Sequence, residues 1–209
     1  MPLHKIINHD PSTKILVWKI TETLEELSGE VALCENSITR IAGMKSEMHQ
    51  RGFLSVRKLL SVCGYADSDL YYDPFGKPHL KDGKHISISH SHECSAIIIS
   101  DKTTGIDLEL RRDKIKLIAD KFIEPSFVLD RNAPDYVNKL TVNWGIKEAV
   151  FKIRNEKGIS FKDHIESALF EMTDGKTKTV LHFNQLQKHF DVFFCEIDEY
   201  TLVYLFETD

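Results

Sequence analysis

The chain has 209 residues, of which 42% are hydrophobic and 28% are charged. This composition is typical of a folded globular protein and excludes a disordered chain. The formal net charge of −5 removes any whole-protein attraction to nucleic acid, so an anionic ligand would have to bind in a local basic pocket. The length fits one large domain or two small lobes.

The four cysteines are widely spaced and form no CxxC pair, which indicates reduced thiols in a cytoplasmic protein. The N-terminus has no long apolar segment of the kind found in secretory signals, and the apolar run at residues 96–99 is far too short to cross a membrane. We therefore expect a cytoplasmic protein that binds neither membranes nor nucleic acid.

The first half of the chain predicts a strand at 14–20 and a helix within 21–34 that begins at a capping threonine. Apolar spacing over 37–62 predicts one long helix or two shorter ones, with a break near Gly52 and an end at Gly64. Beyond a turn-rich loop, three short strands are expected to form a compact β meander. The loop is 73–78 and the strands are 85–89, 95–100 and 104–109.

The second half predicts a helical stretch near 115–122 and a longer helix over 135–154 that is closed by Gly158. Four candidate strands follow and predict a second antiparallel sheet packed against the long helix. They are 167–172, 179–183, 191–196 and 201–206. Both halves combine helices with antiparallel strands, so we expect an α+β fold of two similar lobes, residues 1–103 and 104–209.

Residues 105–109 read Gly-Ile-Asp-Leu-Glu, so an extended chain places Asp107 and Glu109 on one face and apolar residues on the other. A solvated edge strand would explain these two acids, and the pair taken alone favours that interpretation. A divalent cation is the alternative, because it would remove the cost of holding two like charges together.

Along residues 144–152, Trp144, Glu148 and Lys152 are spaced i, i+4 and i+8, which aligns them on one ridge of a helix. An isolated Glu–Lys pair of this kind is usually a surface pair worth about 0.3–0.5 kcal/mol. Trp144 indicates instead that this ridge packs inward. A strand with two acids and a helix with a third predict a Mg²⁺ site that leaves room for substrate phosphates.

Ser89 and His90 end an alternating strand and could donate hydrogen bonds to a phosphate, although such a histidine is more often structural. Gly76-Lys77-Pro78 is a loop with a cation at its centre. The chain has no P-loop, no GxGxxG, no nucleophile elbow and no zinc pattern. A nucleotide would therefore have to bind in some other way.

Five segments, in this order, resemble the 4′-phosphopantetheinyl transferase superfamily, specifically its longer surfactin-synthetase-activating type. They are Arg57-Lys58-Leu59-Leu60, Gly76-Lys77-Pro78, residues 86–91, residues 105–109, and the W-x-x-K-E-A-x-x-K pattern of residues 144–152. The resemblance implies a fold of two pseudo-symmetric lobes in a monomer, whereas the short members of the family have one lobe and trimerise.

The activity implied is that of a holo-[acyl-carrier-protein] synthase. Such an enzyme moves the 4′-phosphopantetheine arm of coenzyme A to a serine of an acyl or peptidyl carrier protein and releases adenosine 3′,5′-bisphosphate. By this resemblance, Asp107, Glu109 and Glu148 would hold Mg²⁺. Lys152 would meet the charge on the pyrophosphate, and Glu148, directly or through a water, would accept the proton of the serine.

The resemblance also implies contacts to coenzyme A. Ser89 and His90 would bind its phosphates, and Gly76, Lys77 and Pro78 would form a wall beside the adenine. Arg57 matches the family's basic position in the N-terminal helix, and Arg51 is a further candidate for the 3′-phosphate. One region departs from the family: residues 121–127, in the element that meets the carrier protein, keep its aromatic character without a clear acid at its last place.

Two other functions fit the same residues. One is a catalytically silent module that binds coenzyme A or a nucleotide, although the intact acids and lysine speak against such decay. The other is an unrelated metal-dependent enzyme of phosphoryl transfer.

Overall fold

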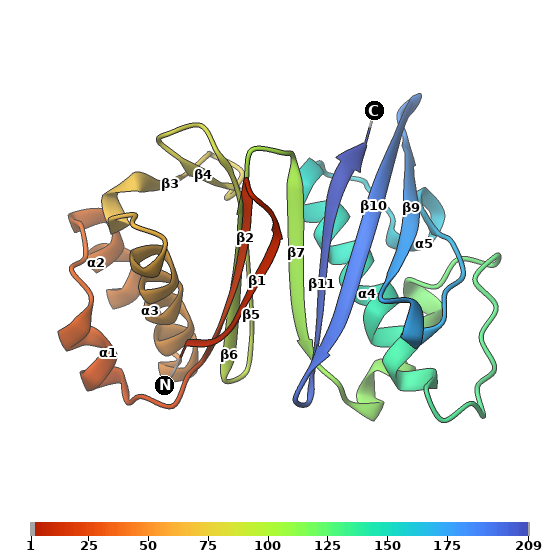
Figure 1. Cartoon of the computed structure of the whole chain (residues 1–209), viewed down its shortest axis with the longest axis horizontal. Coiled ribbons are helices and arrows are strands. Elements are labelled where there is room, and N and C mark those ends of the chain that lie inside the picture. Colours follow the sequence, from red (N-terminus) through yellow and green to blue (C-terminus); the bar gives the residue numbers. More distant parts are fainter. Residues whose placement is uncertain (1–2, 209) are drawn as a thin grey trace. The chain divides into compact units, whose positions relative to one another are not determined.

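The computed structural model describes residues 3–208, and the chain divides into two compact units, residues 1–101 and 102–209. The sequence pattern predicts this division between residues 103 and 104. Over the described residues the fold is α+β, with three antiparallel sheets and five α-helices (Figure 1). The coarse fold class expected from the sequence is therefore confirmed.

The N-terminal unit is built on a four-stranded antiparallel sheet with the strand order β1-β2-β6-β5. A separate two-stranded hairpin, β3 and β4, encloses the turn-rich loop that the sequence predicts. The first strand, β1, was not predicted. The strands are β1 (Leu3–Asp10), β2 (Thr13–Lys19), β3 (Leu70–Tyr72), β4 (Pro78–Leu80), β5 (His85–Ser91) and β6 (Cys94–Ser100).

Three helices, α1 (Leu24–Glu30), α2 (Glu35–Ala42) and α3 (Glu47–Val62), lie on one face of this sheet (Figure 1). Helix α1 begins with a capping box, in which Thr23 Oγ1 accepts from the Glu26 N–H at 3.2 Å and the Glu26 carboxylate accepts from the Thr23 N–H at 2.8 Å. The core of the unit lies between α1, α3 and the sheet. Its fully buried members include Leu27, Leu54, Leu59, Leu60 and Ile97.

The break in the helical region is at residues 43–46, so the prediction of a break near Gly52 is wrong. Gly43 ends α2, and Gly52 lies inside α3. A Cβ on Gly52 would come within 3.1 Å of His90 Cδ2. This glycine therefore leaves room for a neighbouring strand residue and does not end a helix.

The C-terminal unit contains a five-stranded antiparallel sheet with the order β7-β11-β10-β9-β8. The predicted meander of three strands is therefore wrong, since β7 pairs with β11 and not with β6. Hydrophobic alternation locates a strand but does not identify its partner. The strands are β7 (Thr104–Leu110), β8 (Ile165–Ser167), β9 (Lys176–Phe183), β10 (Leu186–Ile197) and β11 (Tyr200–Thr208).

Helix α4 (Tyr136–Arg154) crosses one face of this sheet and contacts β7 and β11 (Figure 1). Its buried residues Ile146, Ala149 and Val150 pack with strand residues such as Val192 and Leu205. The helix is capped by Asn155 in the left-handed conformation, with φ 50° and ψ 35°. Gly158, which the sequence predicts as the closing residue, lies three positions later.

Short segments complete the C-terminal unit. Two 3₁₀ turns, Asp113–Leu117 and Ala119–Lys121, replace the helix expected near 115–122. Helix α5 (Phe161–His164) precedes β8, which begins two residues before the expected strand and is shorter. Over residues 3–208, no helix combines the length and the apolar character that crossing a membrane requires. The four cysteines are free thiols.

Candidate active site

Strand β7 presents Asp107 and Glu109 on one face, as the alternating sequence predicts. Asp107 is 3% exposed and lies opposite Val203 of β11 in the sheet register. Ile106 and Leu108, on the other face, are 0% and 1% exposed. Burial of Asp107 excludes the solvated-edge interpretation for this carboxylate, because a charge in that position requires compensation.

Two glycines let α4 approach β7 and β11 closely. A Cβ on Gly105 of β7 would overlap the main-chain oxygen of Ala149 on α4. A Cβ on Gly145 of α4 would lie 2.7 Å from Val203 Cγ2 and 3.6 Å from Asp107 Oδ2. Because neither glycine has a side chain, Asp107 of β7 lies close to α4, the helix that carries Glu148 and Lys152.

The ammonium group of Lys152 compensates Asp107. Its Nζ lies 2.7 Å from Asp107 Oδ1 and donates to the main-chain oxygen of Ile106 at 2.9 Å. Lys152 is one turn beyond Glu148 on α4, so the ammonium group of Lys152 and the carboxyl group of Glu148 both lie near Asp107 of β7. The structure thus brings together the helix and strand residues that the sequence singled out.

Glu148 is electrostatically coupled to the same group of charges. Its pKa is raised to about 7, chiefly by burial and also by the nearby carboxylates of Asp107 and Glu109, while Lys152 acts in the opposite direction. A carboxyl group with a pKa near neutrality can accept a proton at physiological pH. Perturbation by both burial and specific charged neighbours is typical of functional sites, although structural networks also cause it.

The donor chemistry at this place suits a hard cation. Mg²⁺ binds through one or two carboxylates and completes its shell with water and substrate phosphates. Gly145 leaves the space beside Asp107 Oδ2 that a side chain would fill. Within residues 3–208, however, no three His, Cys, Asp or Glu groups converge tightly enough to hold a metal ion. Asp107, Glu109 and Glu148 are gathered in one region without forming a closed cage.

The lysine next to Glu148 has a different role. Lys147 is fully buried, and its Nζ lies 2.6 Å from Glu124 Oε2 and also donates to the main-chain oxygen of Ile165. Glu124 is 2% exposed, and its Oε1 accepts from the Ser167 N–H at 2.5 Å. The pair joins α4 to the 119–131 segment and to β8, which fixes the rotation of the helix.

Sequence reasoning missed Glu124. The family comparison sought an acid at the end of residues 121–127, whereas the buried acid stands in the middle of that stretch, directly before Pro125. No sequence signal identifies this acid, because its importance follows from the burial of Lys147 on α4, which requires a carboxylate partner. Trp144, on the predicted ridge, packs against Phe122 and Phe161 at ring-centroid distances of 5.2 and 5.5 Å.

A cavity of about 260 Å³ opens beside Glu109 within the C-terminal unit. Trp144, Ile115 and Ile118 supply apolar wall, and Arg112 and Lys114 supply positive charge. The full lining is Glu109, Leu110, Arg112, Lys114, Ile115, Ile118, Thr141 and Trp144.

The remaining predicted residues lie in the N-terminal unit. Ser89 on β5 is 6% exposed, and the adjacent His90 points to the other face and is exposed. The His90 ring passes Gly52 and meets His49 edge-on, with 6.2 Å between ring centroids.

Gly76 and Lys77 lie in the turn between β3 and β4, and Pro78 is the first residue of β4. Gly76 has a φ of +85°, and Asp73 Oδ1 accepts from the Lys77 N–H at 2.9 Å. The backbone of this loop is therefore ordered by its own hydrogen bonds.

Internal partners hold the two predicted arginines. Arg57 is 4% exposed, its Nε lies 3.0 Å from Asp67 Oδ1, and its guanidinium stacks 3.5 Å from the centre of the Phe53 ring. Arg51 donates from Nε to the main-chain oxygen of Glu22 at 2.9 Å. The charge of Arg57 is compensated within the unit, so we do not carry it into the proposed ligand set.

No protein-family model matches this chain, and no curated protein matches it at a significant level. The family resemblance therefore depends on the five sequence segments and their order, and the activity that it implies is a proposal.

Proposed function

We propose that this protein is a 4′-phosphopantetheinyl transferase. It transfers the phosphopantetheine arm of coenzyme A to a serine of an acyl or peptidyl carrier protein and releases adenosine 3′,5′-bisphosphate. The observation that carries this proposal is the meeting of Lys152 and Glu148 of α4 with Asp107 of β7, in two segments whose sequences resemble the family.

The roles follow from the chemistry of the side chains. Asp107, Glu109 and Glu148 hold Mg²⁺, which when bound neutralises the pyrophosphate of coenzyme A. Lys152 supplies a second positive charge that moves from Asp107 to a substrate phosphate. Glu148, directly or through a water, would accept the proton of the carrier serine; its pKa of about 7 belongs to the metal-free protein, and bound Mg²⁺ would lower it.

The coenzyme A contacts proposed in the N-terminal unit are Ser89, His90, Arg51 and the loop of Gly76, Lys77 and Pro78. This assignment comes from the family resemblance alone. We further propose the family's two-lobed pseudo-symmetric fold, a monomer and a cytoplasmic location.

Transfer of a fluorescent arm from labelled coenzyme A to a carrier protein tests the proposal. The protein should label the carrier in the presence of Mg²⁺, and the Asp107→Ala and Glu148→Ala variants should not. Asp113→Ala removes an exposed acid that pairs with Lys116, and it should retain full activity. Circular dichroism of each variant checks the fold. Undiminished labelling by both site variants would overturn the proposal.

A catalytically silent coenzyme A or nucleotide-binding module is the second candidate. It would use the same residues to bind coenzyme A, and the ion pair of Lys152 with Asp107 fits both candidates. Carrier labelling distinguishes the two candidates: a silent module binds coenzyme A without modifying any carrier protein, whereas a transferase modifies at least one.

A further inference from the structure

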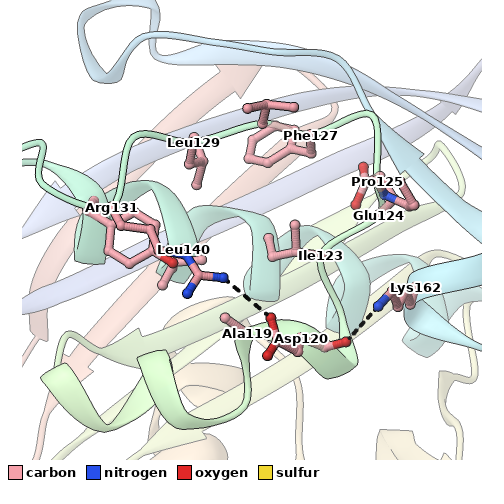
Figure 2. A pocket seen from close by; sticks show the side chains of 12 residues that line it. Ala119, Asp120, Ile123, Glu124, Pro125, Phe127, Leu129, Arg131, Leu140 and Lys162 are labelled. Carbon is pink, nitrogen blue, oxygen red and sulfur yellow. Dashed lines mark hydrogen bonds and ion pairs between the residues drawn. The ribbon is translucent and has the colours of Figure 1, made fainter.

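A second cavity, of about 450 Å³, lies in the C-terminal unit apart from the candidate active site. Its lining comes from the 119–131 segment, from Tyr136 and Leu140 of α4, and from Lys162 of α5. Figure 2 shows the two arms of the 119–131 segment on either side of the hollow, with α4 behind it. The volume is in the range of pockets that hold small organic molecules, roughly 300–1,000 Å³.

The inner wall of this cavity is apolar. Its accessible apolar surface comes from Ile123 and Leu129 (Figure 2) and from Val128, while Leu140 and Phe127 lie beneath at 1% and 2% exposed. Glu124 also lines the cavity, but both of its oxygens are held by other groups of the protein, Lys147 Nζ and the Ser167 N–H. Its charge is thus compensated by a buried lysine, and the wall favours an apolar occupant.

The mouth of the cavity is positively charged. Arg131 Nη2 lies 3.7 Å from Asp120 Oδ1, and Lys162 Nζ donates to the main-chain oxygen of Asp120 at 3.0 Å (Figure 2). The side chains of Arg131 and Asp120 are 77% and 92% exposed, so their pair is weak and readily exchanged. Two cations and one carboxylate leave a net charge of +1 at this rim.

We infer that this cavity binds an amphipathic organic anion, with a carboxylate head and an apolar body. The body lies against Ile123, Val128 and Leu129, and the carboxylate takes the place of Asp120 at Arg131 and Lys162. Inorganic phosphate would leave the apolar wall uncovered, and a neutral apolar molecule would not use the two cations. The inference does not depend on the proposed transfer chemistry, since none of these residues is a proposed ligand of Mg²⁺ or coenzyme A; residues 123–127 do lie in the stretch that the family resemblance places near the carrier protein.

Decanoate is a suitable probe, because it combines an ionised carboxylate with an apolar chain. Calorimetric titration of the full chain should show saturable binding at one site. The double variant Arg131→Ala/Lys162→Ala should weaken decanoate binding about tenfold, as expected for the loss of two charge-assisted contacts. The matched control Lys116→Ala/Lys178→Ala removes the same charge from exposed positions outside the cavity lining and should bind decanoate normally.

Two further measurements test the contacts of the carboxylate head and of the apolar body separately. Binding of 1-decanol, which has no charge, should be equal in the protein and in the Arg131→Ala/Lys162→Ala variant. Leu129→Trp fills the cavity from a partly exposed wall and should abolish binding of both probes, with thermal unfolding as the check on folding. Absence of saturable decanoate binding, or equal weakening by the mouth and control variants, would overturn the inference. If Leu129→Trp does not fold, the Arg131→Ala/Lys162→Ala variant at the cavity mouth still tests the inference.

Discussion

Lys152 of α4 and Asp107 of β7 form an ion pair in which the acid is the more buried partner. The distance from Nζ to Oδ1 is 2.7 Å, and the side chains of Lys152 and Asp107 are 27% and 5% exposed. The buried carboxylate therefore depends on a cation that reaches it from a more exposed position. A divalent cation bound to Asp107 would take over this role and release Lys152 for a substrate phosphate.

Lys152→Met should leave Asp107 uncompensated and lower the free energy of unfolding by about 2–3 kcal/mol. Millimolar Mg²⁺ should recover much of this loss, because the metal replaces the missing charge. Urea unfolding with and without Mg²⁺ measures both effects. Lys178→Met, which breaks an exposed pair with Asp191 at 3.9 Å, should cost less than about 0.5 kcal/mol and should not respond to Mg²⁺. Equal Mg²⁺ stabilisation of the protein and of Lys152→Met would contradict the replacement of the Lys152 charge by Mg²⁺ at Asp107.

Lys147→Met should destabilise the protein by about 3–5 kcal/mol, because it leaves the fully buried Glu124 without its counter-charge. In a double-mutant cycle with Glu124→Gln, the two losses should not add, and the coupling should be about 1–3 kcal/mol. Lys139→Met offers a matched control on the same helix: its Nζ lies 2.7 Å from Glu171, whose side chain is 70% exposed, so the loss should stay near 1 kcal/mol. Equal losses in the two lysine variants would contradict the structural role of Lys147.

The raised pKa of Glu148 predicts a pH-dependent stability. Its ordinary value is 4.5 and its value in the folded protein is about 7, so the folded protein holds this proton more tightly than the unfolded chain. The free energy of unfolding therefore falls as the pH rises from about 4.5 to about 7, by at most about 3 kcal/mol, and levels off above that range. Glu148→Gln removes this contribution, because the amide does not ionise.

The difference in unfolding free energy between the protein and Glu148→Gln isolates the effect, since the other titrating groups are shared. As the pH rises from 5 to 8, the free energy of unfolding of Glu148→Gln should increase relative to that of the protein. Mg²⁺ should reduce that gain, because a nearby cation lowers the pKa of a carboxyl group. A difference that does not change with pH would show that Glu148 titrates normally.

Gly145→Ala should weaken the contact between α4 and β11. Its Cβ would lie 2.7 Å from Val203 Cγ2, so we expect a loss of about 1–3 kcal/mol. Val203→Ala in the same chain should recover part of the loss by removing the methyl group that is hit. Gly29→Ala is the matched control in α1, where a Cβ would meet nothing within 4 Å, and it should stabilise by about 0.5–1 kcal/mol. Thermal unfolding measures the stability of these variants. If Gly145→Ala were as stable as Gly29→Ala, the close contact of Gly145 with β11 would be contradicted.

Local patterns in the sequence predicted much of the candidate site. Alternation over residues 104–110 located β7 and separated its acids from its apolar residues, and helical spacing located α4 to within a residue at its start. Both signals are properties of a single segment, so they need no knowledge of the rest of the chain. The ridge of Glu148 and Lys152 followed from the same periodicity.

Features that depend on distant partners were missed. The pairing of β7 with β11 joins residues about 100 positions apart. The sequence pattern predicts a helix break near Gly52, whereas in the structure the lack of a side chain at Gly52 leaves room for the His90 ring. The role of Glu124 depends on its ion pair with Lys147, which is 23 positions later in the sequence. In each case the deciding contact is made by the tertiary structure, and no short pattern encodes it.

The intact mass of carrier proteins after incubation with coenzyme A and Mg²⁺ is the most direct test of the proposed activity. A panel of acyl and peptidyl carriers avoids dependence on one partner. We predict that at least one carrier gains the mass of a phosphopantetheine arm, and that Glu148→Ala leaves the same carrier unmodified. Binding of coenzyme A without modification of any carrier in the panel would contradict the proposed transferase.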